Sequence, residues 1–251
     1  MTNHTSQRDS LSDLKRLSES FLAGLKGILE NKLIGVYLYG AVVFPETKFT
    51  GDVDFHVILS SPLTEAEKEQ IDALHQELVR NYPPLGEEMD GYYLLEEDAR
   101  GKEPPRSQMW SRAVDNSWAL HRQHIRAGRC IVLHGPDPHS IYPPAGWTEL
   151  EAALDGELDY VAKNLQRYHA YCVLNLCRLM YSFSSRDVVT SKTASAEWAR
   201  AMFPQWAAII NCAEQAYAGK DTLACQIIMD EQLPDLYAFA VEVISRGKSR
   251  N

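Results

Sequence analysis

Residues 51–54 are Gly51-Asp52-Val53-Asp54, in which two carboxylates are separated by a single apolar residue. On a β-strand, positions i and i+2 lie on the same face. We therefore expect Asp52 and Asp54 to point the same way, while Val53 turns into a core. Two crowded carboxylates favour a hard cation, and Mg²⁺ prefers oxygen ligands and completes its shell with substrate phosphates. The motif indicates a magnesium site that handles phosphates, although a solvent-facing Gly-Asp turn has the same composition.

The residues around this motif predict two neighbouring strands. Residues 33–39 (LIGVYLY) are apolar, β-branched and aromatic, which is typical of a buried strand, and the run ends at Gly40-Ala41. Residues 53–59 place alternate apolar side chains on one side. A strand, a glycine turn, a loop and then a strand with paired aspartates is more specific than an isolated acidic turn. This context favours the metal site.

The arrangement resembles the nucleotidyltransferase superfamily of DNA polymerase β, whose motif is Gly-Ser after one strand followed by Asp-x-Asp. The chain is also similar to the bacterial aminoglycoside adenylyltransferases that modify streptomycin and spectinomycin. That second likeness depends on the carboxy-terminal half, at residues 176–182 (LCRLMYS) and 191–199 (SKTASAEWA). Together the two likenesses cover most of the chain from Leu33 onward.

The expected fold class is α+β, with two domains. A nucleotidyltransferase domain, a mixed β-sheet with helices, is expected over residues 1–145. An all-α helical-bundle domain that binds substrate and nucleotide is expected over residues 146–251. Residues 134–146 (HGPDPHSIYPPAG) form the predicted join, because so many prolines and glycines cannot continue a helix or a central strand.

The resemblance implies that ATP is the co-substrate and that Gly40 and Ala41 lie at its phosphates. Arg178 and Lys192 match positions that contact pyrophosphate in the family, where fixed cations stabilise the leaving group. The chain departs from the family at two serines that help to hold phosphates, because Ala41 and Gly51 stand there. It keeps the backbone donors and loses the hydroxyls, each worth about 1 kcal/mol as a neutral hydrogen bond.

Transfer to a hydroxyl also requires a base near the metal. Asp90 is the candidate for this base and for a third metal ligand, because it opens the apolar stretch 91–95 and the family places a glutamate at that point. Glu87 and Glu88 are rivals if the strand register differs. Glu87 and Trp110 are further candidates for contacts with the acceptor, and Trp110 either stacks on a ligand or anchors its loop.

Composition is consistent with a cationic acceptor. The chain has 25 basic and 34 acidic residues, so the formal charge is 25 − 34 = −9, which disfavours nucleic acid as a partner. No apolar run is long enough to span a membrane, and we expect a cytoplasmic monomer. The five cysteines are odd in number and contain no C-x-x-C pair, which predicts free thiols.

We expect the enzyme to transfer AMP from ATP to a hydroxyl of an aminoglycoside or aminocyclitol. Streptomycin-modifying relatives use acidic side chains on the first long helix of the second domain. Around Asn164, Tyr168 and Tyr171 no carboxylate matches, so spectinomycin is favoured over streptomycin. The alternatives are adenylylation of a protein or other acceptor, and a catalytically silent nucleotide-binding module.

Apolar periodicity predicts the remaining elements. A Thr64-x-x-Glu67 capping box should begin a helix that runs to Arg80. His121 and His124 lie on a further expected helix, where we interpret them as packing residues rather than metal ligands. The other expected elements are an amphipathic helix with a face from Leu14 to Leu29, a strand at 130–133, a loop at 96–112, and helices at 158–183, 194–203, 205–217 and 235–244.

Overall fold

The two apolar runs around Gly40 form adjacent strands of a four-stranded sheet with the order β3-β2-β1-β4. The computed structural model describes residues 3–45, 52–114 and 117–249. Strands β1 (Leu33–Tyr39) and β2 (Val53–Leu59) are antiparallel, as are β1 and β4 (Ile131–His134). Strand β3 (Met89–Leu95) pairs with β2 in parallel. The sheet is therefore mixed, as predicted.

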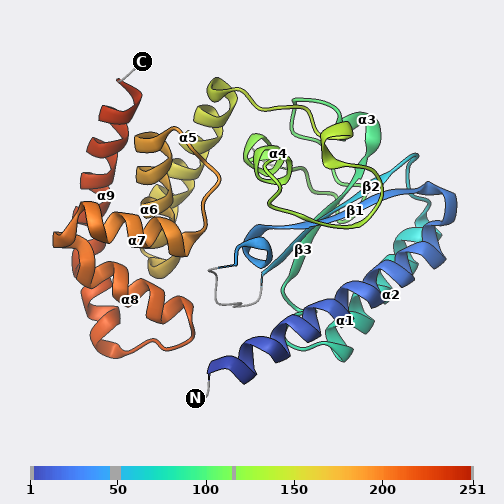
Figure 1. Ribbon diagram of the computed structural model, residues 1–251, viewed down its shortest axis with the longest axis horizontal. Helices are drawn as coiled ribbons and strands as arrows, with labels where there is room; N and C mark the ends of the chain where they lie inside the picture. Colours follow the sequence, from blue (N-terminus) through green and yellow to red (C-terminus); the bar gives the residue numbers. More distant parts are fainter. Residues whose placement is uncertain (1–2, 46–51, 115–116, 250–251) are drawn as a thin grey trace. The chain divides into compact units, whose positions relative to one another are not determined.

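Helices cover both faces of this sheet. Helices α1 (Asn3–Leu29) and α2 (Glu65–Asn81) lie on one face, and α4 (Trp118–Arg126) lies on the other (Figure 1). Alternation along β2 separates two cores, with Phe55 in the core of α1 and α2 and Ile58 in the core of α4. The predicted capping box of α2 is confirmed, because Thr64 Oγ1 accepts from Glu67 N at 3.3 Å.

Short elements complete the first unit, which spans Met1–Ala145. Helix α3 (Glu96–Ala99) opens the segment that was expected to be a loop. The structure also contains the short 3₁₀ turns η1 (Glu30–Lys32), η2 (Gly40–Val43) and η3 (Pro138–Ser140). Turn η2 follows β1 directly and carries Gly40 into the region of the paired aspartates.

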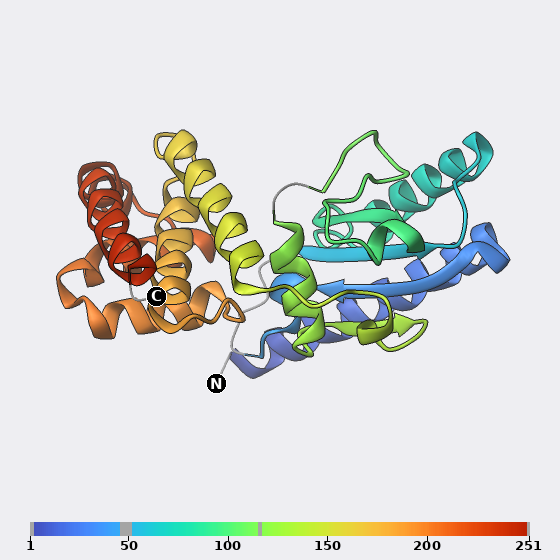
Figure 2. The same ribbon diagram turned by 90° about the horizontal axis from the view of Figure 1, so that it is seen from above.

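The second unit, Gly146–Asn251, is helical and appears in yellow to red in Figure 2. Helix α6 packs against four other helices of this unit, and its interior residues are almost all buried. The described elements are α5 (Trp147–Asn164), α6 (His169–Ser185), α7 (Lys192–Met202), η4 (Pro204–Trp206), α8 (Ala207–Tyr217) and α9 (Leu223–Lys248). A mixed sheet followed by a helical unit confirms the expected α+β class.

Two helix predictions in this unit were wrong. The single helix expected over 158–183 is broken between Asn164 and His169, where the Asn164 side chain donates to the Tyr160 carbonyl at 2.8 Å. The sequence contains neither glycine nor proline at this turn, so periodicity could not locate it. Helix α9 begins after the Thr222 cap, well before the expected start at residue 235. It continues through Pro234 without ending there.

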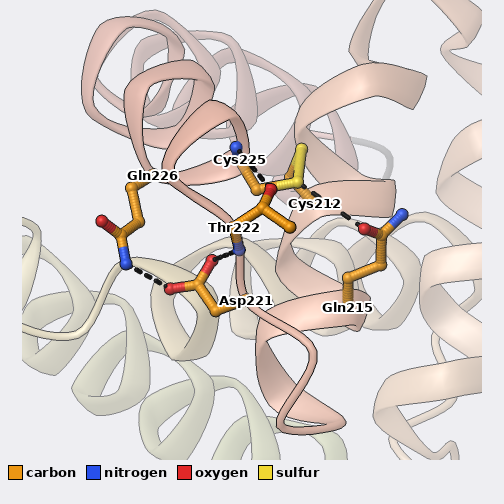
Figure 3. Close-up of a disulfide and its surroundings, with 6 residues drawn as sticks. All are labelled: Cys212, Gln215, Asp221, Thr222, Cys225 and Gln226. Carbon is orange, nitrogen blue, oxygen red and sulfur yellow. Dashed lines mark hydrogen bonds between the residues drawn. A yellow bond between two sulfur atoms is a disulfide. The ribbon is translucent and has the colours of Figure 1, made fainter.

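The prediction of five free thiols was also wrong, because Cys212 and Cys225 form a disulfide (Figure 3). Cys212 lies on α8 and Cys225 in the first turn of α9, and a short connection brings their Cα atoms to 4.9 Å. Thr222 caps α9 by accepting from Cys225 N at 3.2 Å. Cys130, Cys172 and Cys177 are free. None of the described helices is long and apolar enough to cross a membrane.

Candidate active site

Asp54 and Asp90 are neighbours in the parallel pair of β2 and β3, where they are Cα partners. Tyr39, the last residue of β1, is the Cα partner of Asp54 on the other side. Asp52 is exposed and immediately precedes β2, and it shares the strand parity of Asp54. The structure thus brings two of the three predicted carboxylates into register at one end of the sheet, with the third two residues away.

The backbone of Gly40 closes tightly against the Asp54 carboxylate. Gly40 has φ +76°, and a β-carbon built there would lie 1.7 Å from Asp54 Oδ2. A residue without a β-carbon is required both by this contact and by the left-handed conformation. Ala41 follows within turn η2 and accepts from Phe44 N at 3.3 Å. Gly51, the other departure from the serine pattern, lies outside the described residues.

Aromatic side chains, here called the aromatic floor (Tyr39, His56 and Tyr142), lie next to Asp54 on the side of the sheet that faces α4. His56, two residues after Asp54, is fully buried and its Nδ1 lies 3.1 Å from the Tyr142 hydroxyl. The Tyr39 hydroxyl lies 3.2 Å from His121 Nδ1. Burial lowers the pKa of His56 well below its usual range and, together with the charge of Asp54, raises the pKa of Tyr39. Both groups are therefore uncharged at neutral pH, and His121 packs on this floor as expected.

Asp90 is paired with an arginine that the sequence did not single out. Arg112 Nη2 donates to Asp90 Oδ1 and to the Gly91 carbonyl, each at 2.5 Å. The Asp90 side chain is 64% exposed and that of Arg112 is 36% exposed. Arg112 stands on the segment predicted to be a loop, and no local pattern links residue 112 to residue 90.

The other candidates in this unit lie around Asp90. Glu87 and Glu88 are exposed in the turn before β3, where the Glu88 carbonyl accepts from Val53 N at 2.9 Å. They are out of register with Asp54, which favours Asp90 over either glutamate. Trp110 is 44% exposed, and its Nε1 donates to Asp72 Oδ1 at 2.9 Å. Trp110 therefore anchors its segment to α2 while part of its ring stays open to solvent.

The donor set suits magnesium better than a transition metal. Within the described ranges, no group of three or more His, Cys, Asp or Glu side chains is gathered as a metal site. Asp54 and Asp90 nevertheless offer two hard carboxylates in register, and Mg²⁺ commonly binds through one or two protein carboxylates, water and phosphates. The residues present therefore fit a magnesium ion that binds together with a nucleotide.

In the second unit, Arg178 and Lys192 belong to a polar cluster. Lys192 Nζ donates to the Tyr217 hydroxyl at 2.9 Å and lies 4.9 Å from the centre of the Tyr171 ring. Arg178 Nη1 donates to Asn175 Oδ1 at 3.4 Å. Burial raises the pKa of Tyr171, an effect to which Glu157 adds. Both predicted cations therefore lie near the same tyrosine.

Asn175 connects this cluster, and sequence reasoning missed it. Its side chain is 2% exposed on α6, accepts from Arg178 and donates through Nδ2 to Glu157 Oε2 at 3.4 Å. Glu157 comes from α5 and also lies close to Tyr171. Glu157 thus brings a carboxylate into this cluster from the preceding helix, a relationship that depends on how the helices pack.

The sequence is similar to one protein family and to two proteins that share the same name. Residues 142–244 match the family described as aminoglycoside adenylyltransferase, C-terminal domain. Spectinomycin 9-adenylyltransferase of Staphylococcus aureus is 23% identical over 221 residues, covering 78% of this chain and 82% of that protein. The Enterococcus faecalis protein of the same name is 21% identical over 191 residues, covering 68% of this chain and 74% of that protein.

A solved structure has a similar fold. The crystal structure of the spectinomycin adenyltransferase AAD(9) from Enterococcus faecalis with ATP and spectinomycin superposes with a TM-score of 0.72. The match covers 93% of this chain and 99% of that chain at 17% sequence identity. This likeness extends to both the sheet unit and the helical unit.

Proposed function

We propose that this chain, whose residues 142–244 match the aminoglycoside adenylyltransferases, is an enzyme of that family that transfers AMP from ATP to a hydroxyl of spectinomycin or a related aminocyclitol. The observation that supports this most directly is the register of Asp54 with Asp90 beside the tight Gly40 turn. A nucleotidyl transfer needs carboxylates for a metal and a base close to each other, and this end of the sheet provides both.

Asp52 and Asp54 would hold Mg²⁺, with Asp90 as a further ligand. When bound, the ion would neutralise charge on the phosphates and orient them. Gly40 and Ala41 offer backbone N–H groups to the nucleotide in place of the serine hydroxyls found in the family. The aromatic floor is neutral and buried, so it keeps water and competing charge away from the side of the carboxylates that faces α4.

Asp90 would accept the proton of the acceptor hydroxyl. The acceptor oxygen then forms a bond to the α-phosphorus, the bond from that phosphorus to the bridging oxygen breaks, and pyrophosphate leaves with the electron pair. Arg178 and Lys192 would bind the phosphates that become pyrophosphate, because fixed cations stabilise charge that develops on a leaving group. Asn175 would keep the Arg178 guanidinium in place through its side-chain carbonyl.

The net charge of −9 favours a cationic acceptor. Spectinomycin is preferred to streptomycin because the named relatives are spectinomycin enzymes. Trp110 and Glu87 are the proposed acceptor contacts from the sheet unit. Protection of growing cells against streptomycin, but not spectinomycin, would contradict this preference.

The test is pyrophosphate release from ATP and Mg²⁺ with a panel of spectinomycin, streptomycin and other aminoglycosides. We expect release with spectinomycin, and its loss in Asp90→Asn. The matched control is Asp98→Asn, a partly exposed aspartate on α3 of the same unit. If no compound of the panel causes pyrophosphate release although ATP still binds, the result would favour the nucleotide-binding module. Transfer of AMP to a protein acceptor alone would mean that a protein, and not an antibiotic, is the acceptor.

A further inference from the structure

Arg112 is held on three sides in addition to its ion pair with Asp90. Its Cζ lies 4.7 Å from the centre of the Tyr92 ring and 5.4 Å from that of Trp110. The same Nη2 that binds Asp90 Oδ1 also donates to the Gly91 carbonyl. Two aromatic rings and a carbonyl thus fix the plane of the guanidinium before any ligand binds.

The segment that carries Arg112 is tied to the sheet. Ser107 N donates to the Arg112 carbonyl at 2.8 Å, and Gln108 N donates to the Tyr93 carbonyl of β3 at 2.7 Å. The hydrogen bond from Trp110 to Asp72 joins the segment to α2. Trp110 and Ser111 have φ values of +57° and +47°, which side chains other than glycine rarely adopt. Such strain persists where the surroundings hold the backbone, and here it brings residue 112 to Asp90.

Asp90 needs such support, because its side chain is largely exposed. An exposed aspartate samples several rotamers, whereas a base must stay within hydrogen-bond reach of the hydroxyl that it deprotonates. Asp90 is also one methylene shorter than the glutamate found in the family, so small rotations change its reach. The ion pair engages Oδ1 and leaves Oδ2 outside it.

We propose that Arg112 is a positioning residue for Asp90, which holds one carboxylate oxygen so that the other meets the acceptor hydroxyl; this rests on the proposed function. The competing explanation is that Arg112 merely ties its segment to the edge of the sheet through Gly91. The two explanations differ in what they predict for turnover, for nucleotide binding and for replacement of the lost cation.

The experiment compares Arg112→Met, Arg112→Lys and Arg112→Ala in the full chain. For each variant we would measure kcat, KM for both substrates, the Kd for ATP with Mg²⁺ by calorimetry, and the melting temperature. Arg100→Met is the matched control, because Arg100 also joins a carbonyl, Ser140 O, to a carboxylate, Glu96 Oε1, in the same unit.

In Arg112→Met we expect kcat to fall by about tenfold to a hundredfold, part of the roughly 10²–10⁴-fold that a positioned base contributes. The Kd for ATP should stay within about twofold of the wild-type value, which is a much smaller change than the one expected in kcat. Arg112→Lys should recover part of kcat, and added guanidinium ion should recover part of it in Arg112→Ala. Arg100→Met should keep the kcat of the wild type.

Three results would overturn the proposal. One is an unchanged kcat in Arg112→Met. Another is a loss of kcat that follows the melting temperature and is restored neither by lysine nor by guanidinium, as a structural tie predicts. The third is a loss confined to ATP binding. If the wild-type enzyme transfers AMP to no acceptor, the proposed function has failed and this role fails with it, a result distinct from the other three.

Discussion

Gly40 lies so close to Asp54 that a β-carbon on Gly40 would stand 1.7 Å from Asp54 Oδ2. The glycine therefore sets the position of the carboxylate as well as the turn after β1. Substitution at this residue should disturb the site directly.

Gly40→Ala should lower both stability and nucleotide binding. The left-handed backbone at residue 40 costs a residue with a side chain about 1–2 kcal/mol, and the steric clash moves Asp54 in addition. The control is Gly128→Ala, since Gly128 has φ +78° but no atom within 4 Å of a built β-carbon. Thermal unfolding and calorimetry with ATP and Mg²⁺ would show whether Gly40→Ala loses more than the control; equal losses would contradict the contact.

Asp54→Asn should abolish turnover while the fold is preserved, and Asp52→Asn should do the same. Removing a carboxylate that holds the metal should reduce kcat/KM by at least about a hundredfold, similar to the loss of one preorganised electrostatic contact. Circular dichroism would check the fold, and pyrophosphate release would check activity. Normal turnover in Asp52→Asn would remove Asp52 from the site.

Asn175→Ala should weaken ATP binding without any change at the sheet unit. Asn175 accepts from the Arg178 guanidinium, and hydrogen bonds to charged groups are worth about 1.5–3 kcal/mol, or roughly tenfold or more in affinity. Asn164→Ala is the control, because Asn164 donates to a carbonyl of its own helix α5. Calorimetry would measure both affinities. An unchanged Kd in Asn175→Ala would mean that Arg178 needs no such support.

Stability should fall as the pH falls from about 6.5 to about 4, because burial lowers the pKa of His75 to about 4. In this range the unfolded chain binds a proton at His75 and the folded chain does not, so protonation favours unfolding. The largest effect for this one group is about 3 kcal/mol. In His75→Phe, the difference between urea unfolding at pH 7.5 and at pH 4.5 should be smaller than in wild type, although buried His56 keeps part of it.

Cys212→Ser should lower stability in non-reducing buffer, because the disulfide joins residues 13 positions apart. Closing a loop of similar length stabilises a folded chain by about 3 kcal/mol in the chain-entropy model. Reduction of the wild-type protein should produce the same loss, whereas Cys130→Ser, at a free cysteine, should keep the redox dependence. Denaturant unfolding with and without reductant would measure each case. Equal stability in both buffers would contradict a stabilising disulfide.

Local sequence predicted the features that depend on local rules. A continuous apolar run located β1, and alternation located β2. The Thr64 pattern located the start of α2, and the aspartate spacing placed Asp52 and Asp54 at the start of a strand. Each of these depends on neighbours within a few residues, which is the range over which periodicity and capping act. The assignment of roles to the site residues remains a prediction.

The remaining features arise from packing between distant segments. Arg112 reaches Asp90 across 22 positions, Asn175 reaches Glu157 across 18, and Cys212 reaches Cys225 across 13. No local pattern marks such pairs, because each depends on the path of the chain between its members. The break between α5 and α6 was missed for the same reason, since it allows the two helices to pack together.

Strand β3 lies at the edge of the sheet as described, paired on one side by β2, whereas β2 is paired on both sides. A shift of the backbone near the start of β3 therefore disturbs one ladder of hydrogen bonds, and a shift of the backbone at Asp54 disturbs two ladders and the Gly40 contact. Over evolutionary time, the rim of this sheet can exchange one acid for another at little cost to folding. Exchange of the base between glutamate and aspartate is then expected at residue 90, while the centre of the sheet keeps its packing.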